Sequence, residues 1–462
     1  MAGIGFELRR LLARESSVGK LQAYAVAGVV GSGPWVLSII AMLFIGIGQF
    51  QMDSRSALQG AFQVSVTSLM AASLLLTGPL QLAFTRFAAD RIYQQQREQV
   101  LPNLLGLMVL TLLLAFAVGL LLLALFFPPA LFTPASRLAL LCGFSCLCGI
   151  WLVAGLASAV HDYRLVFCAF VLSYSLTVAA ALSLRPLGLA GLLTGFVIGQ
   201  SSLLFSLLAL VAHAFPAPRL LAFDFLARER FHLSLMATGA CYSLALWVDK
   251  FVFWADPLAG FSVIGPLRIS PIYDIPVFLS YISLLPGMAV FLVHLETGVA
   301  WNCHSFFQRI ADGGTLAQII TARKKLVRAV RDGLLAVLKV QGITAVLAVA
   351  AAPDLLQALG LSDSYLPLFK VQIAAAAVEL LLLSALSVLF YLDQLQAALR
   401  VSVVFALSNA LLSWGSLQLS PAFFGYGLLL SVLLCGALAW YALWRALHQL
   451  EYATFMLRAV AL

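Results

Sequence analysis

Six ionisable residues lie within long apolar stretches of the chain, and they are its first candidates for chemistry. They are Asp249, Lys250, Asp274, Lys339, Lys370 and Glu379. A charge near the centre of a bilayer costs several kcal/mol unless it is paired or hydrated, and such residues commonly mark ion or substrate pathways. We therefore predict that these six residues border a transport pathway. The alternative is that they form structural pairs that fix the packing of helices.

Asp249 and Lys250 are neighbours in one predicted helix, and their side chains leave it about 100° apart. They cannot pair as residues four apart on a helix face do. The helices that carry Lys250 and Asp274 are predicted to run antiparallel, with both residues near the same end, so we predict a Lys250–Asp274 contact. Such a contact could serve transport or only packing.

Glu379 lies nearest to the middle of a predicted span. It could relay protons or cations, or bind substrate hydroxyl groups; the alternative is a hydrogen-bonded core glutamate. None of the six residues is an arginine, and the predicted spans hold no cluster of cations. A carrier of a lipid diphosphate would need several basic groups for its phosphates, so the sequence argues against, without excluding, a lipid-diphosphate carrier.

Proline and glycine interrupt two of the predicted spans. Gly33 and Pro34 lie in the first, and Pro271, Pro276 and Pro286 lie in the eighth. A proline inside a helix frees a carbonyl group, which a membrane protein tolerates only against other protein or a wet cavity. We predict that these residues are hinges of broken helices beside the pathway, although proline kinks also occur in static helices.

Six aromatic residues lie mostly near the ends of the same spans. They are Trp35, Tyr242, Trp247, Trp254, Tyr273 and Tyr281. The pattern is typical of an interfacial belt. Stacking on the faces of sugar rings would give the same pattern.

The chain that must position these residues is far too apolar for a water-soluble fold. Of its 462 residues 63% are hydrophobic and 10% are charged, whereas soluble domains carry about 25% charged residues. Uncharged runs of span length recur from end to end, so we predict an all-α polytopic membrane protein with about twelve spans. The predicted spans are 21–49, 58–84, 101–127, 137–160, 165–184, 187–213, 231–254, 271–293, 333–353, 367–391, 401–419 and 421–444.

These spans predict two six-helix bundles, which is a common arrangement in transporters. The predicted parts are an amphipathic cytoplasmic helix at 1–20, an N-terminal bundle at 21–213, a cytoplasmic linker at 214–230, a C-terminal bundle at 231–444 with a long cytoplasmic loop at 294–332, and a cytoplasmic tail at 445–462. The apolar run that begins near residue 21 is too long for a cleavable signal, so we expect it to remain as the first span.

The net charge of +8 reflects topology rather than a nucleic-acid partner, because the basic residues lie between apolar runs. The predicted outer loops hold only Arg55, Arg137, Arg185 and Arg268, so the positive-inside rule places both termini in the cytoplasm.

The densest basic run holds Arg323, Lys324, Lys325, Arg328 and Arg331. It either anchors the chain to anionic headgroups or docks a cytosolic partner.

No cofactor or catalytic residue is predicted. Cys142, Cys146 and Cys148 lack the paired spacing of zinc sites, so no metal site is expected. The sequence also lacks a phosphate-binding loop of the Walker type. An ion gradient or polymer synthesis by a partner would have to drive transport.

Five segments carry a resemblance to a known family. They are MAGIGFELRRLL, LQAYAVAGVVGSGPWVLSI, WVDKFVFW, YDIPVFLSYISLLPG and FFGYG, of which the first is the most specific. Across nearly its whole length the chain resembles the Pel exopolysaccharide transporters (PelG), a branch of the multidrug, oligosaccharidyl-lipid and polysaccharide (MOP) exporter superfamily. The resemblance implies a MATE-like fold with two bundles around a central cavity, but it supplies no established site residues.

The resemblance also implies a function and partners. The expected function is export of an N-acetylgalactosamine-rich exopolysaccharide from cytoplasm to periplasm across a bacterial inner membrane, for a biofilm matrix. The expected partners are a cytosolic glycosyltransferase that uses a nucleotide sugar and membrane subunits that include a cyclic-di-GMP receptor.

Three other functions compete with this one. A drug or cation antiporter of the same architecture would use Asp249, Asp274 and Glu379 to carry protons or sodium. A non-transporting scaffold for the synthase would not need broken helices. A membrane glycosyltransferase would need clustered acids and sizeable loops, whereas the outer loops hold single acids at Asp53, Asp256, Asp354 and Asp363.

Overall fold

The described part of the chain is almost entirely helical. The structure is a computed structural model, and it describes residues 24, 27–28, 31, 36–45, 53–157, 163–227 and 232–452. Within these residues eight helical segments are long and apolar enough to cross a membrane, or nine if one bent pair counts as a span. The predicted all-α membrane fold is confirmed. The predicted helix 1–20 and most of the predicted first span 21–49 lie outside the described residues.

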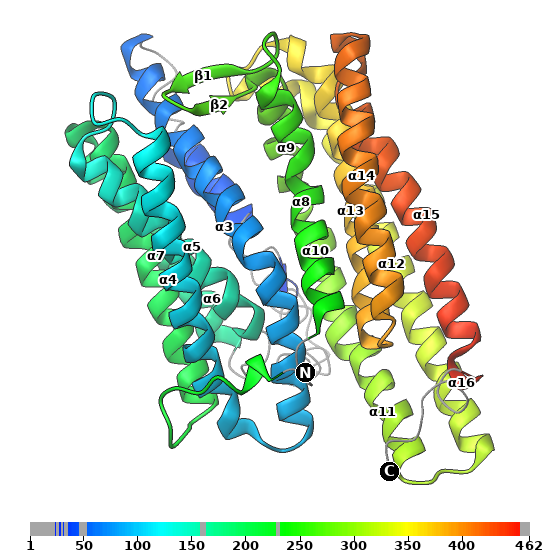
Figure 1. Cartoon of the computed structure of the whole chain (residues 1–462). Helices are drawn as coiled ribbons and strands as arrows, with labels where there is room; N and C mark the ends of the chain where they lie inside the picture. The colour runs from blue at the N-terminus through cyan, green and yellow to red at the C-terminus, as the bar shows by residue number, and fades with distance from the viewer. Residues whose placement is uncertain are drawn as a thin grey trace.

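The N-terminal bundle is built from five long helices that pack on one another (Figure 1). They are α3 (Asp53–Tyr93), α4 (Val100–Phe126), α5 (Pro134–Ala157), α6 (Tyr163–Leu184) and α7 (Gly188–Ala214). Residues Val36–Ile45 add a short apolar helix. One-turn 3-10 helices at Arg97–Gln99, Arg185–Leu187 and Asp224–Leu226 join or follow these helices.

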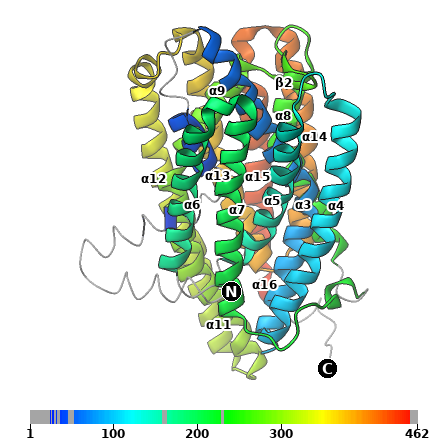
Figure 2. The same cartoon turned by 90° about the vertical axis from the view of Figure 1, so that its left-hand side faces the viewer.

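The C-terminal bundle follows in the second half of the chain. Its helices are α8 (Leu233–Ala255), α9 (Pro271–Ile282), α10 (Leu285–His294), α11 (Ala300–Ala311), α12 (Leu316–Ala358), α13 (Leu366–Tyr391), α14 (Leu395–Leu419), α15 (Tyr426–His448) and α16 (Leu450–Tyr452). A π-helical turn at Leu295–Val299 joins α10 to α11, and 3-10 turns at Asp363–Tyr365 and Pro421–Phe423 precede α13 and α15. Seen from the side of the N-terminal bundle, α7 and α5 lie in front of the C-terminal helices (Figure 2).

The outer faces of the bundles are apolar. Leu113, Leu121 and Leu125 of α4 and Leu347 of α12 are all more than half exposed. Such faces suit hydrocarbon, and helices can enter it because their backbone groups bond within the helix. The bilayer is therefore the solvent for the outside of the fold.

The predicted long loop at 294–332 is wrong, because the segment is helical except at residues 312–315. Thr315 caps α12 in a capping box with Gln318, so the helix begins well before its apolar part. At 1.5 Å per residue its 43 residues span about 65 Å, twice the roughly 30 Å of a hydrocarbon core. Phe306 of α11 and Leu326 of α12 are buried in the same apolar cluster, so the two helices pack together as a hairpin.

A small β-hairpin between α8 and α9 was not predicted. Strands β1 (Phe261–Ile264) and β2 (Leu267–Ile269) pair antiparallel, and the turn at Gly265 has a left-handed φ of 55° that favours glycine. Arg268 fixes the hairpin to the end of α8 by donating to the carbonyl oxygens of Trp254, Asp256 and Gly260. The hairpin lies between the two bundles at one end of the molecule, which we call the hairpin end (Figure 1).

The two bundles meet most extensively where α3 crosses α8. A Cβ added at Gly239 would collide with the carbonyl oxygen of Gly78, and one added at Gly78 would collide with the hydroxyl of Ser243. Small residues let membrane helices approach until their backbones touch. The α3–α8 crossing is therefore a contact between backbones.

We expect Gly239→Ala to destabilise the protein. Alanine favours a helix by about 1 kcal/mol over glycine, but overpacking costs about 1–3 kcal/mol, and no change of rotamer can move the Gly78 backbone. The melting temperature of the detergent-solubilised protein should fall. Gly415→Ala is the matched control, because nothing lies within 4 Å of an added Cβ there; equal melting temperatures for the two variants would contradict the tight crossing.

Candidate functional site

Asp249 and Lys250 of α8 form a buried ion pair. The Lys250 Nζ lies 3.1 Å from Oδ2 of Asp249, and the two side chains are 1% and 0% exposed. The ammonium also donates to the carbonyl oxygen of Leu246, at 2.9 Å. The expectation that these neighbours cannot pair is wrong, because the 100° separation describes where side chains leave the helix and not how far a lysine reaches. A buried ammonium needs a nearby anion, and the carboxylate of Asp249 is within its reach.

Two tyrosines of α9 extend this pair. The Tyr273 hydroxyl donates to Asp249 at 2.8 Å, and the Lys250 Nζ lies 5.6 Å from the centre of the Tyr281 ring. The Tyr281 hydroxyl in turn donates to Glu379 of α13 at 3.5 Å. Asp249, Lys250, Tyr273, Tyr281 and Glu379 thus form one set of contacts across α8, α9 and α13, which we call the buried polar cluster. All five are at most 5% exposed.

The predicted Lys250–Asp274 contact is wrong, because the hydrogen bonds of Asp274 come from the start of α9 and the end of α8, both to Oδ2, and its buried Oδ1 has no partner among the described residues. Its Oδ2 accepts from the backbone N–H of Ser270 at 3.0 Å and from the indole Nε1 of Trp254 at 2.7 Å. An acid in the first turn of a helix commonly bonds the N-cap N–H in this way. Asp274 therefore fixes the start of α9 against the end of α8.

Lys339 and Lys370 lie apart from the cluster. Both are exposed, on α12 and on the first turns of α13. The structure therefore brings together Asp249, Lys250 and Glu379 out of the six predicted residues.

The prolines of the eighth predicted span differ in their positions. Pro271 is in the first turn of α9, where its missing N–H is harmless, and Pro276 lies inside that helix. Pro286 lies in the first turn of α10, directly after a break at which α9 and the following helix bend by 48°. Gly33 and Pro34 lie outside the described residues.

Several aromatic residues expected in an interfacial belt lie in the interior instead. Tyr273, Tyr281, Trp247 and Trp254 are all less than 10% exposed. Their phenol and indole groups satisfy buried charges, a role that sequence position alone does not distinguish from a membrane interface.

A second buried polar pair was missed because it lies in the predicted loop. Glu296 sits in the π-helical turn and accepts from the Tyr391 hydroxyl at 3.1 Å. π-helical turns are frequent at functional sites, but no sequence signal marked this one. Among the described residues the buried carboxylates are Asp249, Asp274, Glu296 and Glu379, all in the C-terminal bundle.

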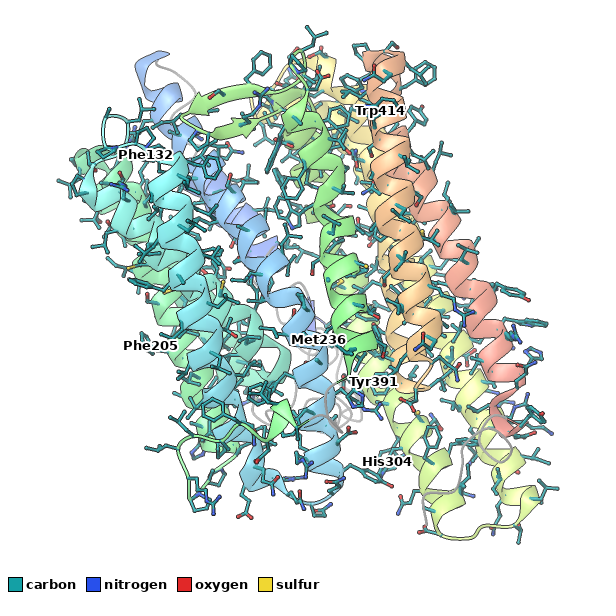
Figure 3. All side chains as sticks on the ribbon, in the orientation of Figure 1. Phe132, Phe205, Met236, His304, Tyr391 and Trp414 are labelled. Atoms are coloured by element: carbon teal, nitrogen blue, oxygen red, sulfur yellow. The ribbon has the colours of Figure 1, made fainter. Side chains whose placement is uncertain are left out.

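An ion bridge links the bundles at the end opposite the hairpin. Arg86 Nη1 of α3 lies 3.0 Å from Oδ1 of Asp393, in the turn between α13 and α14, and Arg86 Nε lies 3.1 Å from Asp90. Asp393 has a left-handed φ of 60°, which a short polar side chain tolerates. We call Arg86–Asp393 the inter-bundle bridge and this end the bridge end. Tyr391, labelled in Figure 3, lies near this end.

At the hairpin end the bundles touch through the β-hairpin. An added Cβ at Gly265 would lie 3.1 Å from the ring of Phe132, which precedes α5 in the N-terminal bundle, and one at Gly60 of α3 would lie 3.8 Å from Val263. Phe132 is 1% exposed and is seen at this end in Figure 3. The bundles are therefore joined at both ends, and residues of the N-terminal part also contact the C-terminal bundle elsewhere. Gly28 and Gly31 lie against α10, and Leu43 packs on the cluster that contains Leu279 of α9.

A metal centre has no support in the part of the chain that the structure describes. No three His, Cys, Asp or Glu side chains gather there in a way that could hold an ion.

The family of the chain follows from its sequence as a whole. The profile of PelG, described as "Putative exopolysaccharide Exporter (EPS-E)", matches residues 1–455. The chain belongs to the PelG family. A search of curated proteins gave no match.

Solved structures with the same fold are MATE and MOP transporters. A Vibrio cholerae MATE transporter shares 15% identity, with 96% of this chain and 98% of that chain covered and a TM-score of 0.63. An outward-facing multidrug resistance MATE transporter of the MOP superfamily shares 11% identity, with 98% and 99% covered and a TM-score of 0.62. A MOP superfamily transporter from Pyrococcus furiosus shares 11% identity, with 98% and 99% covered and a TM-score of 0.58. Family and fold together indicate a multi-pass membrane exporter and not an enzyme.

Three of the segments that resemble PelG converge on the buried polar cluster. WVDKFVFW contributes Asp249 and Lys250, and YDIPVFLSYISLLPG contributes Tyr273 and Tyr281. Phe253 stacks on Tyr273 with ring centres 3.8 Å apart and meets Phe424 of FFGYG at 4.9 Å. Two of these three segments contribute residues to the cluster and the third packs beside it, whereas Glu379 lies outside all of them.

We expect Asp249→Asn to destabilise the protein strongly, because it leaves the Lys250 ammonium buried without its partner. Breaking a buried pair costs about 3–5 kcal/mol, whereas removing both charges is much less harmful. Melting temperatures should therefore fall for Asp249→Asn and largely recover in Asp249→Asn/Lys250→Gln.

The combination Asp274→Asn/Lys250→Gln is the control, because those residues do not touch and their effects should add. Recovery in this pair, and not in the Asp249 pair, would contradict the observed contacts.

Proposed function

We propose that this PelG-family protein exports an N-acetylgalactosamine-rich exopolysaccharide from cytoplasm to periplasm across a bacterial inner membrane. It acts with a cytosolic glycosyltransferase during formation of a biofilm matrix. The family match supports the polymer as cargo, and the MATE-like fold supports export by movement of two bundles. The bridge end, which carries the basic α11–α12 hairpin, is the cytoplasmic end in this proposal.

The single observation that carries the mechanism is the distribution of contacts between the bundles. At the bridge end they are held by the α3–α8 crossing and the Arg86–Asp393 bridge, and at the hairpin end by the Gly265–Phe132 contact. An ion pair about one-third exposed contributes about 0.2–1 kcal/mol. The Arg86–Asp393 bridge can therefore break and reform while the bundles stay intact. Opening one end at a time gives alternating access.

The buried polar cluster has a different part in this mechanism. Its charges are neutralised inside the C-terminal bundle, so they hold α8, α9 and α13 together as one body. The 48° bend before Pro286 separates α9, which carries Tyr273 and Tyr281, from α10. Substitution of Asp249, Lys250 or Glu379 should therefore stop secretion through loss of the shape of the bundle.

The assay that tests this function uses sealed inverted vesicles containing the synthase complex, with the protein present or absent. Polymer made from external nucleotide sugar should become protected from added glycosidase only when the protein is present. Arg86→Cys/Asp393→Cys joined by a bismaleimide should abolish protection, in a background without the exposed Cys142 and Cys168.

Each single-cysteine variant treated with the same reagent is the control and should retain export. If the polymer is equally protected from glycosidase without the protein, the protein is not needed for export. Full export by the cross-linked protein would contradict alternating access.

The glycosyltransferase is proposed to dock on the α11–α12 hairpin. Lys324, Lys325, Arg328 and Arg331 are exposed on α12, so a helix and not an irregular loop presents them. Arg323 differs, because it donates to the carbonyl oxygens of Leu447 and His448 and so ties α12 to the end of α15. The remaining partners of the proposal are membrane subunits that include a cyclic-di-GMP receptor.

We expect glutamine at Lys324, Lys325, Arg328 and Arg331 together to abolish co-purification of the synthase without changing the amount of protein in the membrane. Arg323→Gln is the control and should lower stability while preserving co-purification. If the quadruple variant keeps the synthase but loses binding to anionic vesicles, the basic face is a membrane anchor instead.

A cation-coupled antiporter is the second candidate, favoured by the four buried carboxylates of the C-terminal bundle. It would use Asp249, Asp274 and Glu379 to carry protons or sodium. The same vesicles separate the two functions, because dye export driven by an ion gradient, without the synthase, is expected only of the antiporter.

A further inference from the structure

An apolar pocket opens on the C-terminal bundle, away from the buried polar cluster. It has a volume of about 710 Å³ and lies between Tyr24 and Gly28 on one side and α10 and α12 on the other. Leu285, Ala289, Val290 and Val340 provide most of its apolar wall. This volume falls within the roughly 300–1,000 Å³ of ligand pockets.

Lys339 is the charged residue of this pocket. It is exposed, and it makes no hydrogen bond or ion pair with any residue that the structure describes. Its neighbours on the α12 surface, Leu335, Leu338 and Ile343, are exposed and apolar, as expected of a face that meets lipid tails. A lysine in such surroundings is costly unless an anion accompanies it or its ammonium reaches the interface.

The polar side chains of the pocket lie at two levels, because Lys339 is six residues beyond Gly333 on α12 and so about 9 Å deeper than His294. His294, at the end of α10, packs beside Gly333 of α12, and Gly287 lies at the level of Gln341. The two helices thus run side by side from the bridge end inward, with His294 nearest that end and Leu285 deepest. Tyr24 also lines the pocket, and a tyrosine suits the headgroup region.

We propose that this pocket binds an acidic phospholipid of the surrounding membrane. Its phosphate lies beside Lys339 and His294, and one acyl chain runs along Leu285, Ala289 and Val290. Charge complementarity selects the headgroup, because one lysine near a membrane surface contributes about 1 kcal/mol to attraction for anionic lipid. Leu285 and Pro286 line the pocket directly after the 48° bend, so the bound lipid supports the bent form of this span.

The test compares binding of phosphatidylglycerol and phosphatidylcholine to the purified full-length protein, by native mass spectrometry and by melting temperature. The wild-type protein should prefer phosphatidylglycerol and be stabilised by it. Lys339→Gln should weaken that binding about fivefold, which is the equivalent of about 1 kcal/mol. Lys370→Gln is the matched control, since Lys370 is also exposed in a span but does not line the pocket, and it should bind as the wild type does.

Ala289→Trp is a second variant, which fills the pocket without changing any charge and should also lose the bound lipid. A photoactivatable phosphatidylglycerol should label peptides of α10 and α12 in the wild type only. Equal binding of the two lipids by the wild type, or wild-type preference in both Lys339→Gln and Ala289→Trp, would overturn the proposal. Displacement of phosphatidylglycerol by an equimolar polyprenyl phosphate would show that a lipid carrier, and not a phospholipid, is the occupant.

Discussion

Hydrocarbon offers no hydrogen-bond partners, and this constraint governs the interior of each bundle. Every ionised or polar group carried into the membrane must find its partner within the protein or at a wet surface. Asp249 and Lys250 meet the constraint by pairing with each other and with Tyr273. Asp274 meets it with one carboxylate oxygen only, at the start of α9. The charges therefore make the C-terminal bundle cohesive instead of opening it to water.

Cohesive bundles can move relative to each other only where the contacts between them are few. The α3–α8 crossing and the Arg86–Asp393 bridge act at one end, and the β-hairpin acts at the other. Gly28, Gly31 and Leu43 also pack against α9 and α10. None of these contacts includes a member of the buried polar cluster. The contacts that hold the C-terminal bundle together are thus different from the contacts between the bundles. Export by rigid-body movement requires this separation.

The sequence predicted what depends on long-range composition and missed what depends on local geometry. Apolar runs of about twenty residues were enough for the spans, because burial in a bilayer requires length and apolarity alone. The segment 294–332 looked like a loop because it is charged, yet lysine and arginine are good helix formers and Thr315 supplies the cap.

The sequence identified residues of the candidate site but not the contacts between them. Rarity of charge singled out Asp249, Lys250 and Glu379, but the angle between neighbouring side chains suggested the wrong partner for Lys250. The sequence positions of Tyr273 and Tyr281 fit an interfacial aromatic belt and a buried core equally well. The inter-bundle bridge joins residues 307 positions apart, and no local pattern reports such a contact.

The central claim is that two rigid bundles open at one end while they close at the other. Electron–electron distance measurements in lipid nanodiscs test it most directly, with one spin-label pair at Leu131→Cys and Phe423→Cys near the hairpin end and another at Tyr93→Cys and Leu316→Cys near the bridge end. Each pair labels one exposed residue of each bundle. The account predicts two distance populations for each pair, and conditions that lengthen one distance should shorten the other. A single unchanged distance at both ends, with and without an active synthase, would contradict it.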